Sequence, residues 1–238
     1  MRGPHPYGPA WWRARVLARV QQGIAWYMPQ AVRSAVRRDL AGVWHHGAGP
    51  PGPGGAVVVA NHHSWWDGYL AWLVAARQGR PFAVLVDDAT LERYPFFRRV
   101  GAVGVGELRA AVRRAAAGDW LFVFPEGRLG PTHELGPFAP GAATIARLAG
   151  VPVLPMAWRV VMRGQQYPEV YLRRGAALPA GAGPEAQRSA VAALLDDVDR
   201  DLGRAFDAEA PVPGYALLFG GRRSKQERVA RWRRWWGA

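Results

Sequence analysis

Short apolar runs alternate with helical patterns along most of this chain, and this alternation restricts the fold more than any other feature. The apolar runs cover residues 56–60, 82–86, 102–105, 120–124, 151–158 and 170–172. Helical spacing of apolar residues follows or separates them at 65–77, 108–117, 141–149 and 187–206. Strands and helices that alternate in this way predict an α/β fold with a mostly parallel sheet flanked by helices.

The Gly- and Pro-rich segment 47–55 reads as a loop that leads into the first of these strands. A chain of 238 residues suits one domain of ordinary size with short additions. We therefore expect amphipathic membrane-surface helices over 1–46, a core over 47–210 and a basic, aromatic tail over 211–238.

Positive charge is concentrated at the two ends of the chain. The formal net charge is +13; residues 1–40 carry seven Arg and one Asp, and residues 222–238 carry six Arg, one Lys and one Glu. Such ends call for an anionic partner, either nucleic acid or an acidic lipid surface. They are also suited to recruiting an acidic carrier protein.

Apolar residues recur at helical spacing over 11–28 and, after Pro29, over 31–40, with arginines between them. Tryptophan and arginine on one amphipathic element suit the lipid headgroup zone, and the Trp-rich stretch 222–236 has the same character. The alternative is a helix packed on the core with a solvated Arg face. No apolar run approaches the roughly 20 residues of a membrane span, and the N-terminus has no signal-peptide apolar core. We expect peripheral attachment to the cytoplasmic face of the cell membrane.

The chain contains no cysteine, which excludes disulfides, thiolate nucleophiles and iron–sulfur clusters. Catalysis would have to come from oxygen and imidazole groups. Polar residues appear abruptly where the run 56–60 ends, in Asn61, His62 and Asp67. In α/β sheets ligands bind at this end of the strands.

A five-residue separation puts His62 and Asp67 on different faces of a regular helix, so they can meet only across a turn. If Ser64 caps the following helix, Asp67 lies in its first turn and can accept a hydrogen bond from the imidazole. The carboxylate would fix the tautomer while the other ring nitrogen takes a proton from a hydroxyl. The pair predicts a general base.

Three blocks in this order resemble the glycerolipid acyltransferase family, which includes 1-acylglycerol-3-phosphate acyltransferases. Asn61, His62 and Asp67 match its Asn-His-x4-Asp signature, residues 124–127 match its Phe-Pro-Glu-Gly block, and the prolines within 151–155 match its late strand. The resemblance covers about residues 55–160. It implies a mixed seven-stranded sheet flanked by helices, and a helical pair on the bilayer that residues 11–43 would form.

By the same resemblance His62 is the base, Asp67 its partner and Glu126 a residue of the acceptor site. The further substrate-binding candidates are Asn61, Gly127, Arg128 and Arg109. The implied reaction moves an acyl group from acyl-CoA or an acyl carrier protein to a lipid acceptor. No other cofactor and no metal is expected.

Two departures from the family pattern concern the acceptor. Glu107 stands where the family has an arginine for the acceptor phosphate, and Arg128 is displaced by one position from the family's later arginine. Guanidinium groups hold phosphate by paired hydrogen bonds, so position matters. A glycosylated lipid or isoprenoid is therefore an alternative acceptor, and Arg109 is a candidate substitute from the next turn.

Other interpretations stay open at this stage. Glu126 could be a loop acid that caps a turn, and His63 with His133 could be read as metal ligands, although no carboxylate-rich cluster supports them. The tryptophans at 65, 66 and 72 fit either an acyl tunnel or the core. Two alternative functions remain for the whole chain. A hydrolase would use the same general base with water in place of the lipid hydroxyl. A basic nucleic-acid-binding protein would explain the positive charge, but it would not explain the blocks at 61–67 and 124–127.

Overall fold

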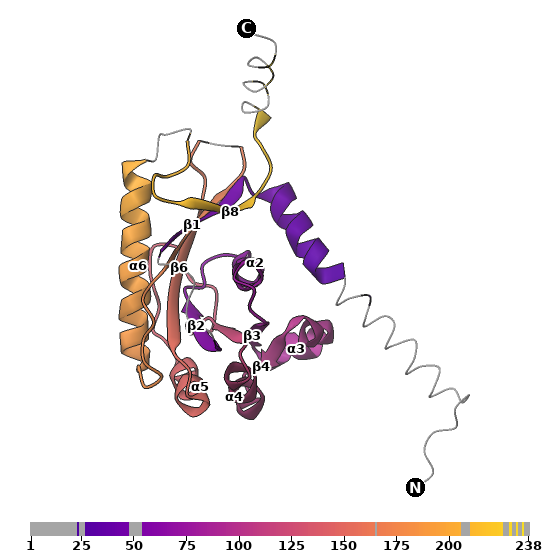
Figure 1. The fold of residues 1–238 in the computed structure, drawn as a ribbon, viewed down its shortest axis with the longest axis vertical. Coiled ribbons are helices and arrows are strands. Elements are labelled where there is room, and N and C mark those ends of the chain that lie inside the picture. The colour runs from indigo at the N-terminus through magenta and orange to yellow at the C-terminus, as the bar shows by residue number, and fades with distance from the viewer. Residues whose placement is uncertain are drawn as a thin grey trace, which may run out of the picture.

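The computed structural model describes residues 23, 27–47, 54–164, 166–205, 210–225, 229, 232 and 235. They form an eight-stranded sheet in the order β4-β3-β5-β2-β6-β7-β1-β8 (Figure 1). The strands are β1 (Gly42–Gly47), β2 (Ala56–Ala60), β3 (Phe82–Val86), β4 (Ala102–Gly104), β5 (Trp120–Val123), β6 (Val153–Val161), β7 (Glu169–Arg174) and β8 (Ala216–Gly220). The helices are α2 (Asp67–Arg77), α3 (Asp88–Arg93), the 3-10 helix η1 (Pro95–Val100), α4 (Leu108–Ala116), α5 (Gly141–Ala149) and α6 (Pro184–Arg204).

The sheet is mixed and mostly parallel, which confirms the predicted fold class. Strands β4, β3, β5, β2 and β6 run parallel to one another, whereas β7 is antiparallel to β6 and β8 is antiparallel to β1. The described residues contain one strand more than the seven that the resemblance implied. Strand β1 crosses the expected limit at residue 46 and β8 lies beyond 210, so the sheet extends past both expected limits of the core.

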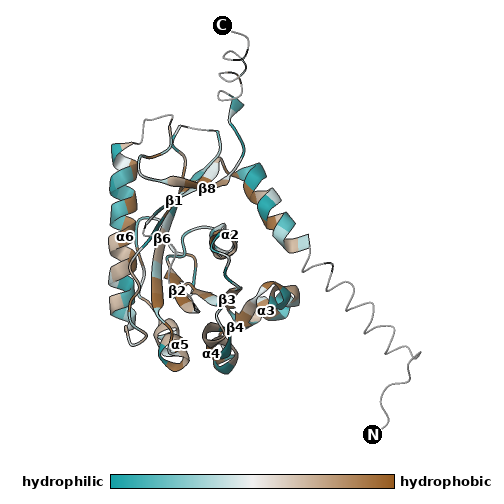
Figure 2. Cartoon of the chain, viewed as in Figure 1, coloured by the Kyte–Doolittle hydropathy of each residue, from teal (hydrophilic) through white to brown (hydrophobic). Residues whose placement is uncertain are grey.

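Both faces of the sheet are covered, and this explains why the central strand is apolar at every position. All five residues of β2 are buried. Val58 belongs to the core beneath α2, whereas Val57 and Val59 belong to the core beneath α4, α5 and α6. Figure 1 shows α2 on the inner side of the curved sheet and the other three helices on its outer side. In Figure 2 the strands are mostly apolar, while hydrophilic residues gather on α6 and on the helix over 27–39.

Residues 27–39 are helical, and Pro29 does not interrupt the helix within this range. Val32 and Val36 pack into the core beneath α2. The guanidinium of Arg33 lies 5.4 Å from the centre of the Trp72 ring. The apolar stripe of this part therefore packs on the core, as in the alternative interpretation of the N-terminal pattern. Most of the predicted element 11–28, and most of the Arg- and Trp-rich stretch 222–238, lie outside the described residues.

Asp87 and Asp88 are exposed just after β3, and both carboxylates accept hydrogen bonds from the backbone. The Asp87 carboxylate accepts a hydrogen bond of 2.8 Å from the amide of Thr90 and caps the N-terminus of α3. Asp88 accepts a bond of 3.2 Å from the amide of Gly106, beyond β4.

The order of the strands places the predicted site. Strand β2 lies between β5 and β6. After β2 the chain first forms β3, β4 and β5 on one side of this strand, and it then crosses to form β6 on the other side. A crevice at the carboxyl ends of the strands is expected at such a reversal. The blocks that follow β2 and β5 therefore meet beside β6.

Candidate active site

Asn61, the first residue after β2, ties this strand to β6. Its side-chain amide donates to the carbonyl of Trp158 at 3.1 Å, and its carbonyl accepts from the Trp158 amide at 3.0 Å. The side chain is fully buried and its donor and acceptor are both used. The structure assigns Asn61 a positioning role in place of the predicted substrate contact.

His62 and Asp67 meet across a turn, as the sequence predicted. Nδ1 of His62 lies 2.7 Å from Oδ2 of Asp67. Helix α2 begins at Asp67 and its N-cap is Trp66, so the predicted cap at Ser64 is wrong. The Ser64 hydroxyl instead accepts from the amide of Trp66 at 3.1 Å, which shapes the turn just before the helix.

Asp67 is fully buried and receives hydrogen bonds from three donors. Besides the imidazole, the amide of Ser64 donates to Oδ2 at 3.0 Å and the indole Nε1 of Trp158 donates to Oδ1 at 2.7 Å. An amide and an indole can only donate, so the buried carboxyl group acts as an acceptor on both oxygens. Its remaining partner, Nδ1 of His62, therefore carries the hydrogen in this arrangement.

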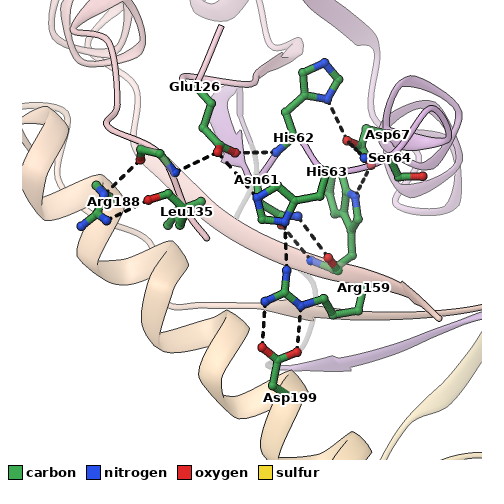
Figure 3. A network of polar contacts seen from close by, with 12 residues as sticks. Asn61, His62, His63, Ser64, Asp67, Glu126, Leu135, Arg159, Arg188 and Asp199 are labelled. Carbon is green, nitrogen blue, oxygen red and sulfur yellow. Dashed lines mark hydrogen bonds and ion pairs between the residues drawn. The ribbon is translucent and has the colours of Figure 1, made fainter. Parts of the chain in front are cut away.

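The second ring nitrogen of His62, Nε2, lies on the edge of the ring away from Asp67 (Figure 3). The imidazole stacks on the Phe124 ring, with centroids 4.6 Å apart, and 27% of the His62 side chain is exposed. Figure 3 shows Nδ1 directed at Asp67 and the opposite edge of the ring directed away from it. With the hydrogen on Nδ1, Nε2 offers a lone pair at the accessible edge and can act as a general base.

Glu126 lies directly behind the base and contacts the backbone. Its side chain is only 4% exposed. Oε1 accepts from the amide of His62 at 2.7 Å, and Oε2 accepts from the amide of Gly136 at 3.0 Å. The resemblance implied that Glu126 belongs to the acceptor site, whereas its observed contacts hold the His62 loop against the loop that follows β5.

Hydrogen bonds outweigh burial in setting the charge of Glu126. Burial acts to raise its pKa, but the nearby imidazole of His63 and the hydrogen bonds from the amides of His62 and Gly136 lower the pKa below its usual value. A carboxyl group with a lowered pKa in the folded state stabilises the fold above its unfolded pKa. That contribution is lost as the pH falls through the folded pKa.

Glu126→Gln is therefore expected to reduce the free energy of unfolding at neutral pH by about 1.5–3 kcal/mol, because an amide cannot accept from both backbone amides. The difference from wild type should shrink below about pH 4.3, the ordinary Glu pKa, as the wild-type carboxylate takes up a proton. Urea unfolding followed by tryptophan fluorescence at several pH values measures both effects. A difference that stays constant across this range would contradict the assignment.

Gly127 and Arg128 lie in the turn after β5, beside the base. Gly127 has φ +67°, a left-handed conformation that favours glycine, and its amide bonds to the carbonyl of Phe124 at 3.0 Å. Arg128 is exposed at this edge. Arg109 is exposed too, but it follows β4, which is three strand spacings, or about 14 Å, from β2. Arg128 thus follows the strand next to β2, whereas Arg109 follows β4 at the far end of the parallel block.

Glu107 closes the turn between β4 and α4. Its carboxylate accepts from the amide of Gly104 at 2.9 Å and from Nη1 of Arg98 at 2.6 Å. Arg98 and the backbone hydrogen bond lower the pKa of Glu107 against the opposing effect of burial. The acid that replaces the family's arginine is thus paired with an arginine brought in by η1.

Trp158 was missed as a site residue, because the sequence places it only in a strand. Its contact with Asp67 joins residues 91 apart in the chain, and no spacing pattern reveals it. Of the three candidate tunnel tryptophans, Trp66 and Trp72 pack against the core, whereas Trp65 is 66% exposed. No group of three His, Asp or Glu side chains in the described part of the chain could hold a metal ion.

A cavity of about 160 Å³ lies on the α2 side of the sheet, away from the catalytic pair. Val74 and Gln78 line it, at the C-terminal end of α2, whereas Asp67 begins that helix. None of the predicted site residues lines this cavity.

Comparison with known proteins agrees with this geometry. Residues 45–159 match the family model described as Acyltransferase. Over 52 residues the chain is 40% identical to a 1-acyl-sn-glycerol-3-phosphate acyltransferase of Pseudomonas aeruginosa; the match covers 22% of this chain and 19% of that protein. The fold is similar to the crystal structure of the 1-acyl-sn-glycerophosphate acyltransferase PlsC from Thermotoga maritima, with a TM-score of 0.50 and 22% identity over 80% of this chain and 83% of that one.

The family model begins in β1 and ends in β6, so it spans every strand around the His62–Asp67 pair. The mixed sheet, its order and the site at the end of β2 are consistent with that match. Residues 45–159 thus match the Acyltransferase family model, and the matched relative and the similar fold support the resemblance to the glycerolipid acyltransferases.

Proposed function

We propose that this protein transfers a fatty acyl group from a thioester, carried on coenzyme A or an acyl carrier protein, to a hydroxyl of a lysophospholipid or other lipid acceptor. The observation that carries the proposal is the pair of His62 and Asp67, 2.7 Å apart, with the imidazole at the accessible end of β2. The matches to the Acyltransferase family model and to a 1-acyl-sn-glycerol-3-phosphate acyltransferase support lipid acyl transfer, and the geometry supports His62 as its base.

In the proposed mechanism Nε2 of His62 takes the proton of the acceptor hydroxyl as its oxygen attacks the thioester carbonyl. Asp67 holds Nδ1–H and stabilises the imidazolium that forms. When the tetrahedral intermediate collapses, the carbon–sulfur bond breaks and the thiolate takes the proton back from Nε2. The products are an ester and a free thiol, and no acyl-enzyme is needed.

The environment of Glu107 supports a second candidate acceptor, a glycosylated lipid or isoprenoid. A carboxylate occupies the place where the family's arginine is expected to hold phosphate, and Arg98 is engaged by that carboxylate. Because this ion pair compensates the charge of Arg98, the corner attracts an acceptor phosphate less than an unpaired arginine would. Sugar hydroxyls, which donate and accept hydrogen bonds, do not depend on such a charge.

Exposed apolar residues around the same end of the sheet support attachment to a membrane surface. Trp65 follows β2, Leu129 follows β5 and Val105 follows β4, and their exposed fractions are 66%, 55% and 53%. Arg128 and the basic ends of the chain add positive charge, which suits an anionic lipid surface. No helix among the described residues is long and apolar enough to cross a bilayer. We propose peripheral attachment at the cytoplasmic face rather than nucleic-acid binding.

The test is an acyl-transfer assay with a labelled long-chain thioester on anionic vesicles. Lysophosphatidic acid, a lysophospholipid with a larger headgroup and a glycolipid are offered in parallel, with coenzyme A and carrier-protein donors. We expect a labelled ester with at least one acceptor, and vesicle sedimentation of the protein. Free fatty acid alone in the presence of every acceptor would establish a hydrolase, and retention on nucleic acid without transfer would support the binding-protein interpretation.

A further inference from the structure

We infer that helix α6 positions the catalytic base through two side-chain connections that converge on Glu126. One connection runs from Asp199 through Arg159 and His63, and the other is made by Arg188. We call these four residues the α6 clamp. The inference rests on the proposed function, since it concerns how His62 is held. Arg188 and Asp199 lie outside the 45–159 segment that matches the family model.

The first connection begins with a paired salt bridge. Nε and Nη2 of Arg159 donate to the two carboxylate oxygens of Asp199 at 2.8 and 2.7 Å. The remaining arm of the guanidinium, Nη1, lies 2.9 Å from Nδ1 of His63 (Figure 3). Arginine has donors only, so Nδ1 of His63 must accept and its hydrogen must reside on Nε2. Arg159 therefore selects the tautomer of His63.

That tautomer directs an N–H group at Glu126. Nε2 of His63 is buried, has no hydrogen bond within the described residues, and lies 3.6 Å from Oε2 of Glu126. The distance is longer than a hydrogen bond, but a buried N–H facing a carboxylate is attractive in a site with little water. The other carboxylate oxygen of Glu126 accepts a hydrogen bond from the backbone amide of His62. The chain of contacts thus ends on the backbone of the base.

The second connection holds the loop on the far side of Glu126. Nε and Nη2 of Arg188 donate to the carbonyls of Gly136 and Leu135 at 3.0 and 2.8 Å. The amide of Gly136 donates in turn to Oε2 of Glu126. A Cβ on Gly136 would lie 3.2 Å from that oxygen, so the glycine lets the loop approach closely.

Strand β6 links the clamp to the partner of the base. Successive side chains of a strand point to opposite faces of the sheet. Trp158 reaches Asp67 on the α2 side, and its neighbour Arg159 reaches Asp199 of α6 on the other. Adjacent residues of one strand therefore orient both halves of the His62 environment, the imidazole partner on one face and the backbone on the other.

The test compares variants of the full-length protein in the acyl-transfer assay. Arg159→Met should lower kcat by about 10- to 100-fold, because a small displacement of the base is costly, with little change in the KM of the thioester. Arg200→Met is the matched control, since it removes an exposed arginine of α6 that pairs only with Asp197 among the described residues. It should keep wild-type kcat. Thermal unfolding of both variants checks that the fold persists.

Substitutions of His63 keep the test informative even if Arg159→Met fails to fold. His63→Gln retains an acceptor for Arg159 and a donor for Glu126, so it should restore most of the kcat that His63→Leu loses. Nitrogen-15 NMR of the wild-type imidazoles should find the hydrogen of His63 on Nε2, and in Arg159→Met this preference should weaken.

The outcomes separate the two proposals. A folded Arg159→Met or His63→Leu protein with wild-type kcat, beside an inactive His62→Ala protein, would overturn the clamp and leave the proposed function intact. If no variant or wild type transfers acyl groups, the NMR measurement still decides, because a His63 hydrogen on Nδ1 in the wild type would overturn the clamp by itself.

Discussion

His62→Ala is expected to lower kcat for acyl transfer by about 10²- to 10⁴-fold, the contribution typical of a general base. The imidazole is the only group in the described site that couples an accessible nitrogen to a buried carboxylate. Without it, the acceptor hydroxyl must attack with its proton still attached. Binding of donor and acceptor should change far less than turnover, because the lost interaction forms fully only in the transition state.

The same substitution should be mild for stability. The His62 side chain is partly exposed and its main packing contact is the ring of Phe124, so a loss of about 1 kcal/mol is expected. His133→Ala, which removes an exposed histidine of the loop after β5, serves as the matched control and should keep full activity. Equal turnover by the two variants, with both folded, would eliminate His62 as the base.

The parallel part of the fold was predictable because each of its strands is a short apolar run that can be recognised from its own residues. A strand covered on both faces is apolar at every position, and the run 56–60 shows this plainly. The strands β1 and β8 were not predicted. β1 follows a short apolar start with two histidines, so it shows no full apolar run. β8 is apolar in sequence but lies at the edge of the sheet, where three of its five positions are exposed, and a short apolar run alone does not reveal such a strand.

The contact between His62 and Asp67 was predictable for a similar reason, because the two residues are close in sequence and the turn between them is short. The residues that hold this pair in place were not predictable from the sequence. Trp158, Arg159 and Asp199 reach the site over separations of 40 to 97 residues, which only the order of the strands and the packing of α6 decide. Asn61 and Glu126 were predicted as substrate-binding residues from their sequence blocks. Their bonds to backbone groups show that they shape the site from behind.

Asp67→Asn is expected to be nearly as damaging as loss of the base, although it changes one atom. All three partners of Asp67 present hydrogens, so the new amide group must face a donor wherever it points. If it faces Trp158, a buried indole N–H loses its acceptor, which costs about 1–3 kcal/mol. If it faces His62, Nδ1 must accept, and the ring hydrogen moves to Nε2.

In that second arrangement the accessible nitrogen has no lone pair for the acceptor proton. A fall in kcat of about 10⁴-fold is the precedent for such a tautomer change beside a catalytic histidine. Nitrogen-15 NMR of His62 in the variant should find the hydrogen on Nε2, whereas the wild type should carry it on Nδ1. Asp88→Asn, at an exposed carboxylate that accepts from the amide of Gly106 beyond β4, is the control and should leave turnover unchanged. An Asp67→Asn protein that is folded and fully active would mean that the carboxylate neither orients the ring nor stabilises its charge.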